Sequence, residues 1–333
     1  MVPGAEARVQ QLSGVLARSP FYAKIGFSLD SCHEGGACVL LRYDEGNTTA
    51  ATALHGGAIA ATLEAGGAMA AWASTDPDAG NLEGRTLACD VSYIAGALGE
   101  DVFGEGRVLR RGKEIVYVDA RVVNADGKLL ATGNHIYQLR ATGTGGDRRD
   151  QNPPGSASGE PPSRGPGRTL GGIGALPRQP RDIVDRNTER ISSLDGRMPY
   201  MANLGFRLVE ADYGRCVFRM PCAGAARGED GGLAGGALLS AVDHAGSLAA
   251  WLTMPFGDRE LFGSTVNTKV QIFSPRIDGD VLVDARAEGG CGPVFHSVVE
   301  IATCAGESVA QGSTIYRIVE RASGARRDAG VGA

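Results

Sequence analysis

Two isolated carboxylates are the residues of this sequence with the clearest chemical potential. Glu64 is the only residue charged at neutral pH between positions 54 and 75, and Asp243 has the same status between 233 and 254. Burying a lone carboxylate is costly unless it is paired or neutralised. A solvated helix edge and a buried structural hydrogen bond are alternative explanations. We favour catalysis, in which the carboxylate acts as a base or a nucleophile.

A pair of glycines precedes each carboxylate at the same distance. Gly56 and Gly57 come before the first, and Gly235 and Gly236 before the second. Each pair stands where a loop is expected to become a helix, so its N–H groups lack helical partners and lie at the positive end of the helix dipole. Without a side chain in the way, a substrate carbonyl could approach these donors, as in an oxyanion site. An ordinary helix start is the alternative.

The repeated pattern extends well beyond these residues. Positions 54–72 and 233–251, which are 179 residues apart, are identical at eight of nineteen sites. A repeat of this length is a domain rather than a solenoid unit. Between the copies the chain is rich in glycine and proline and has no aromatic residue, which is typical of a flexible linker. We predict domains over 1–140 and 181–321, a linker over 141–180 and a disordered tail over 322–333.

The same order of elements is expected in both copies. A short amphipathic helix and one strand come first, followed by a long helix that is apolar on every side and therefore buried. Four strands with period-two alternation complete each copy. This order predicts an α+β fold, with a central helix wrapped by an antiparallel sheet. The long helices are expected over 56–74 and 235–253, and the later strands over 86–94, 101–110, 115–124, 129–139, 265–273, 280–288, 295–304 and 308–318.

Composition narrows the class of protein. A net charge of -5 argues weakly against nucleic acid as the main partner. The seven cysteines are odd in number and form no CxxC pair, so we expect neither a disulfide framework nor a metal site. The N-terminus lacks the pattern of a signal peptide, and the long apolar stretches resemble core helices rather than membrane spans. We therefore expect a cytoplasmic protein without a membrane partner.

The motif resembles a known family. His55, the two glycines, six further residues and Glu64 resemble the HGG motif of hotdog-fold acyl-CoA thioesterases, the PaaI-type group of the thioesterase superfamily. Stretches 98–101, 110–115, 126–133, 273–275 and 278–280 resemble the last strands of that family, and the resemblance covers 19–140 and 198–319. It implies two tandem hotdog domains that form a double hotdog.

The resemblance also implies a site built across a pair of domains. In the family, the helix N-terminus of one subunit polarises the thioester carbonyl, and the carboxylate of the partner subunit attacks it or activates water; here the partner is expected to be the other half of the chain. Because Ala234 stands where the first copy has histidine, we expect the first centre to dominate; a histidine that only orients the loop is the alternative. The expected centres are His55, Gly56 and Gly57 with Asp243, and Ala234, Gly235 and Gly236 with Glu64.

Five further residues match family positions or suit the substrate. Thr86 and Thr265, equivalent at the offset of 179, would hold the carboxylate or the attacking water. Asn47 is the candidate for the family's asparagine. Arg111 and Lys113 could bind the CoA phosphates. Ordinary strand positions for the threonines and a solvated turn for the basic pair are the alternatives.

Taken together, these residues predict an acyl-CoA thioesterase. It would need no metal or redox cofactor, since CoA arrives as part of the substrate. A non-catalytic acyl-CoA or acyl-carrier-protein binding protein is the alternative, and a thioesterase acting on acyl-carrier protein is a weaker one. No GxSxG elbow or GxxxxGK[ST] loop occurs. Exposed sheet edges suggest a homodimer of double hotdogs. The acyl pocket is expected between the long helices, at Ile59, Leu63, Leu238 and Val242.

Overall fold

The computed structural model describes residues 5–49, 52–77, 82–141, 180–194, 197–254, 261–274, 277 and 279–320. The tail predicted over 322–333 lies outside these residues, as does nearly all of the linker predicted over 141–180. The proposed domain boundaries therefore stay predictions.

The first copy begins with two helices that pack beside its sheet. Ser19 caps the second of them, accepting a hydrogen bond from the Tyr22 N–H at 3.3 Å. The long buried helix follows after two strands. The elements are α1 (Ala5–Arg18), α2 (Pro20–Ile25), β1 (Phe27–His33), β2 (Gly36–Leu41), η1 (Glu45–Asn47), α3 (Gly56–Ala73), β3 (Leu82–Tyr93), β4 (Val102–Arg111), β5 (Ile115–Asn124) and β6 (Leu129–Ala141).

The second copy repeats this order, which confirms the predicted tandem α+β architecture. Its long helix again begins at a Gly-Gly pair. The elements are α4 (Arg181–Leu194), α5 (Pro199–Asn203), β7 (Arg207–Asp212), β8 (Arg215–Met220), η2 (Gly224–Ala226), α6 (Gly235–Trp251), β9 (Leu261–Ile272), β10 (Val281–Cys291), β11 (Val294–Thr303) and β12 (Ser308–Glu320).

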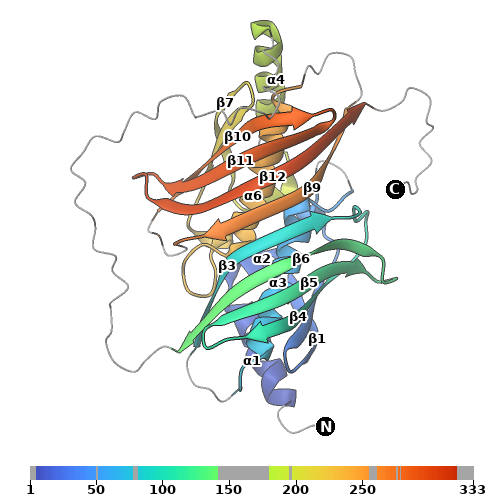
Figure 1. Cartoon of the computed structure of the whole chain (residues 1–333), viewed down its shortest axis with the longest axis vertical. Coiled ribbons are helices and arrows are strands. Elements are labelled where there is room, and N and C mark those ends of the chain that lie inside the picture. Colours follow the sequence, from blue (N-terminus) through green and yellow to red (C-terminus); the bar gives the residue numbers. More distant parts are fainter. Residues whose placement is uncertain are drawn as a thin grey trace.

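All twelve strands form one sheet. Figure 1 shows it as a continuous twisted surface with α3 and α6 behind it. The strand order is β1-β2-β4-β5-β6-β3-β9-β12-β11-β10-β8-β7, so each domain contributes six neighbouring strands. Each long helix packs on the strands of its own domain, and the two helices also pack on each other.

The two domains join edge to edge between β3 and β9. These strands pair antiparallel from Ala88 opposite Gln271 to Ser92 opposite Asn267. At the middle of the pairing, Asp90 faces Lys269, with Nζ 2.9 Å from Oδ2. Positions 90 and 269 are themselves 179 apart. The pseudo-twofold axis that relates the domains therefore passes through this ion pair.

Small side chains let α3 lie directly on the sheet, as its sequence predicted. Every residue of α3 from Gly57 to Ala73 is buried. A Cβ added to Gly66 would lie only 2.5 Å from the Gly104 carbonyl oxygen, and one added to Gly104 would collide with the Thr62 carbonyl. At these points the helix backbone touches the strand backbone without side chains between them.

Two edge strands were not predicted from the sequence. We expected one strand before each long helix, but β1 precedes β2 and β7 precedes β8. Most side chains of β1 and β7 are exposed or only half-buried, because each strand ends the sheet and carries little of the core. Their hydrophobic periodicity is accordingly weak. Of the helices in the described residues, none combines the length and apolar character needed to cross a membrane.

Candidate active site

The first centre is built at the start of α3. His55 is the N-cap residue, and its Nδ1 accepts a hydrogen bond from the Gly57 N–H at 2.9 Å. The His55 backbone N–H donates to the Asn47 carbonyl at 2.9 Å. The imidazole is buried. Burial lowers the pKa of His55 to about 4, so the ring is neutral at pH 7.

The carboxylate of this centre comes from the other domain. Asp243, on the third turn of α6, lies against the first turn of α3: a Cβ added to Gly56 would be 2.7 Å from its Oδ2. That oxygen is 3.9 Å from His55 Nδ1. Glycine at position 56 is therefore a steric requirement for bringing the carboxylate to the helix N-terminus. The structure thus brings together the residues expected at the first centre.

Two threonine hydroxyls of the second domain hold the Asp243 carboxylate in place. Thr265 donates from Oγ1 to Oδ1 at 2.8 Å, and Thr268 donates to the same oxygen at 3.4 Å. Burial raises the pKa of Asp243 to about 6, although these bonds and contacts with Tyr93 and the Gly57 N–H partly offset the rise. The group is thus ionised at neutral pH and holds a proton more readily than an exposed aspartate, which suits a general base.

The second centre repeats the arrangement without the histidine. Ala234 is the N-cap residue of α6 and provides no side-chain hydrogen bond to the helix. Glu64 of α3 lies against this helix start, since a Cβ on Gly235 would be 2.8 Å from its Oε1, and one on Gly236 would be 3.2 Å from Oε2. Each carboxylate therefore faces the glycine pair of the partner domain.

Glu64 accepts two hydrogen bonds from hydroxyl groups. Thr86 Oγ1 donates to Oε1 at 2.5 Å, and Tyr22 donates to Oε2 at 3.0 Å. His135 Nε2 is 3.0 Å from the same threonine hydroxyl. Burial raises the pKa of Glu64 to about 7, against the lowering effect of the two hydroxyls. Glu64 therefore holds a proton more readily than an exposed glutamate does.

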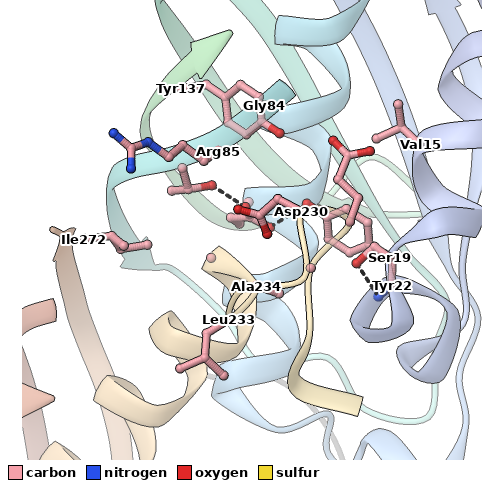
Figure 2. Close-up of a pocket in the computed structure, with 15 residues that line it drawn as sticks. Val15, Ser19, Tyr22, Gly84, Arg85, Tyr137, Asp230, Leu233, Ala234 and Ile272 are labelled. Carbon is pink, nitrogen blue, oxygen red and sulfur yellow. Dashed lines mark hydrogen bonds between the residues drawn. The ribbon is translucent and has the colours of Figure 1, made fainter. Parts of the chain in front are cut away.

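A small pocket opens onto Glu64 (Figure 2). Its volume is about 40 Å³, which exceeds the roughly 10–15 Å³ that one water needs. Arg85, Glu229 and Asp230 are among its lining residues, and Glu229 pairs with Arg18 at 3.2 Å. One water molecule would fit beside the carboxylate in this pocket. Apolar and aromatic lining residues come from α1, α2, β6, β9 and the loop before α6: Val15, Tyr22, Tyr137, Ile272 and Leu233.

Other predicted residues lie away from the two centres or are already engaged. The Asn47 side chain donates to the Ile25 carbonyl at 2.8 Å, so it holds the chain behind His55. Arg111 donates to Ser74 at the C-terminal end of α3, about 26 Å along the helix from Gly56. Lys113 is exposed in the turn after β4. The structure does not bring the two basic residues to the first centre, and their binding of CoA phosphates stays a prediction.

The structure corrects the prediction of an acyl pocket between the two long helices. The four side chains predicted to line it are all part of the hydrophobic core. These side chains are buried in the core formed by α3, α6 and the sheet, and they do not line the pocket of Figure 2. They are Ile59, Leu63, Leu238 and Val242.

Several residues at the centres escaped sequence reasoning. Tyr22 and His135 contact Glu64 or its threonine, while Tyr200 and His244 contact His55. Segments 19–22 and 198–201 lie at the offset of 179 and each contain a tyrosine, but the sequence gave no sign of these contacts. Among the described residues, no group of three or more His, Cys, Asp or Glu side chains is placed to hold a metal ion.

Comparisons with known proteins agree with this architecture. Residues 52–131 match the family model described as Thioesterase superfamily. The acyl-CoA thioesterase II TesB2 of Mycobacterium marinum is 12% identical, covering 93% of this chain and 99% of its own, with a TM-score of 0.51. The tesB protein of Mycobacterium avium subs paratuberculosis gives the same values. A hot dog fold protein from Alicyclobacillus acidocaldarius is 16% identical over 90% and 97%, with a TM-score of 0.50.

At these identities the solved structures establish the fold alone, and no curated protein sequence matches the chain. The fold and the crossed centres define a double hotdog protein. Within it, residues 52–131 of the first domain match the thioesterase superfamily model.

Proposed function

We propose that this protein hydrolyses acyl-CoA thioesters at the centres between its two domains. The observation that supports this most strongly is the contact of a buried carboxylate with the glycine start of the partner helix, made twice by unlike residues. The family match supports thioester chemistry. CoA as the thiol follows the resemblance of the HGG motif and the name of the M. marinum protein.

At the first centre, the thioester carbonyl oxygen would accept a hydrogen bond from the Gly56 N–H. The negative charge that develops on this oxygen is stabilised by a donor fixed in advance and by the helix dipole. Asp243 removes a proton from water, and the hydroxide adds to the carbonyl carbon. The carbon–sulfur bond then breaks, and the proton passes to the leaving CoA thiolate. Direct attack by Asp243, with hydrolysis of the resulting anhydride, is the other route.

Thr265 and Thr86 have the same part in both routes, because each orients the carboxylate of its own domain. No metal or redox cofactor enters this scheme. The second centre would work alike through Gly235 and Glu64. Since it lacks the capping imidazole, we expect the first centre to give most of the turnover.

Thiol release from a panel of acyl-CoAs tests the proposal. The variants are Asp243→Asn, Glu64→Gln and the double substitution, which keep the shape of each side chain and remove its charge. We expect the double variant to lose turnover, and Asp243→Asn to lose most of it. Binding of acyl-CoA by the wild type without thiol release from any substrate would instead identify a binding protein. Unchanged turnover in the double variant would place the chemistry elsewhere.

A further inference from the structure

A second histidine, outside the HGG motif, meets His55 at the first centre. His55 Nε2 lies 3.4 Å from His244 Nδ1. Both side chains are buried, with 5% and 7% of their surface exposed. His244 follows Asp243 on α6, so it approaches His55 from the partner domain.

The hydrogen bonds around His55 define which nitrogen carries its proton. The Gly57 N–H donates to Nδ1 at 2.9 Å, so Nδ1 must offer a lone pair. In a neutral ring the proton is then on Nε2, which faces His244. His244 must accept at Nδ1 and carry its own proton on Nε2. The two contacts thus form a chain of hydrogen bonds in which Gly57 donates to His55 and His55 donates to His244.

The surroundings keep both rings neutral and in place. Tyr200 stacks on His55 with ring centroids 5.2 Å apart, while Phe206 and Phe218 meet the His244 ring edge to face. Burial lowers the pKa of both imidazoles, and their mutual repulsion lowers that of His244 further. A charged imidazole donates from both nitrogens, so it could not accept the hydrogen bond that this chain requires of each ring.

The two imidazoles are also present or absent together. At the offset of 179, His55 corresponds to Ala234 and His244 corresponds to Ala65. Both alanines are buried at the second centre. One centre therefore has the complete pair and the other has neither ring, as expected if each imidazole depends on the other.

We propose that His244 is a positioning residue that fixes the tautomer of His55 and thereby the first turn of α3. Without an acceptor at His244 Nδ1, the buried Nε2–H of His55 would have no hydrogen-bond partner, and the ring would turn away from the Gly57 N–H, which would no longer fix its tautomer. The turn that presents Gly56 to Asp243 would then shift. The effect on turnover rests on the proposed function, whereas the tautomer does not.

Two substitutions separate this role from simple packing. In His244→Asn the side-chain oxygen lies near the former Nδ1 and keeps an acceptor for His55. In His244→Leu the volume is retained but the acceptor is lost. Thermal unfolding of both variants reports whether the fold is intact. His55→Ala assigns the His55 signals among the five histidines of the chain.

The decisive measurement is ¹⁵N NMR of histidine-labelled protein. We expect the wild type and His244→Asn to show His55 with unprotonated Nδ1 and protonated Nε2, and His244→Leu to lose this pattern. A wild-type His55 pattern in His244→Leu would overturn the proposal. This readout holds even if no acyl-CoA is hydrolysed, so it is independent of the proposed activity.

Kinetics give the second readout. We expect kcat for thiol release to fall about tenfold or more in His244→Leu, with KM changed much less, because a small misplacement of the turn weakens transition-state contacts. His244→Asn should recover most of kcat. If both variants lost kcat equally at unchanged thermal stability, the hydrogen-bond acceptor at position 244 would not be the cause of the loss.

Discussion

At the scale of single residues, the two carboxylates of the proposed centres have raised pKa values. Burial raises the pKa of Asp243 to about 6 and that of Glu64 to about 7, because it disfavours their charged forms. A general base works only when deprotonated. We therefore expect kcat for thiol release to rise with pH and level off above about 7. The inflection should lie nearer 6 if Asp243 carries most of the turnover, and nearer 7 in Asp243→Asn, where Glu64 remains. A pH profile without an inflection between 5 and 8 would exclude both groups.

The same shifts make stability depend on pH. The folded-state pKa values lie above the ordinary 3.8 for aspartate and 4.5 for glutamate. Between the ordinary and the raised value the folded protein binds more protons than the unfolded chain, so its stability falls as pH rises through that interval. Each group then destabilises the fold by on the order of 3 kcal/mol above pH 7.

Removing both charges should abolish that part of the pH dependence. We expect the variant with Asp243→Asn and Glu64→Gln to be more stable than the wild type at pH 8 and similar at pH 4. Urea unfolding at several pH values measures the difference. Parallel stability curves for the two proteins would show that burial does not shift these groups.

Glycine at the start of each long helix is a steric requirement. We expect Gly56→Ala to reduce turnover about 100-fold, because its Cβ would displace the Asp243 carboxylate. Gly235→Ala should act in the same way on Glu64 and Thr86, with a smaller effect on the total rate. Thiol release measures both. Gly96→Ala is the control, since an added Cβ there has no neighbour within 4 Å.

At the scale of elements, the close contact of α3 with β4 sets how deep the helix lies in the sheet. We expect Gly104→Ala to destabilise the protein by about 1–3 kcal/mol, because its Cβ would push the helix away from the strand. Gly96→Ala should change stability by less than about 0.5 kcal/mol. Urea unfolding compares the two, and an equal effect would mean that the helix can move without cost.

The sequence predicts most elements because their patterns are strong. The long helices were found within two residues of their ends, since their apolar, small-residue composition is continuous. The carboxylates and glycines of the candidate site were found because they recur at one offset. His244 and Tyr22 were not, because their contacts depend on how α3, α6 and α2 are placed against one another. Such placement comes from packing across domains and leaves no local spacing in the chain.

At the scale of the whole molecule, unlike charges meet where the domains join. Asp90 and Lys269 occupy equivalent positions on the pseudo-twofold axis. If two first domains paired through β3, aspartate would face aspartate; two second domains would bring lysine against lysine. The sequence predicted pairing of the copies but not this strand contact, because Asp90 and Lys269 resemble ordinary surface residues of a strand.

Charge reversal tests whether the Asp90–Lys269 pair favours the contact between the two unlike domains. We expect Lys269→Asp to lower the free energy of unfolding by about 1 kcal/mol or less, since the pair is partly exposed. Adding Asp90→Lys should restore most of the loss. Urea unfolding of the four proteins in a double-mutant cycle, at low and high salt, gives the coupling. If the variant with both substitutions were no more stable than Lys269→Asp alone, the charges at these two positions would not contribute to the stability of the contact.

The joining of two unlike domains in one chain also affects how its sequence can diverge during evolution. In a homodimer, one codon alters both centres at once, so a substitution that improves one and harms the other cannot be separated. Here each centre draws its helix start from one half of the gene and its carboxylate from the other, and each half is present once. The two centres differ in this way, because one has both imidazoles and the other has alanine at both equivalent positions.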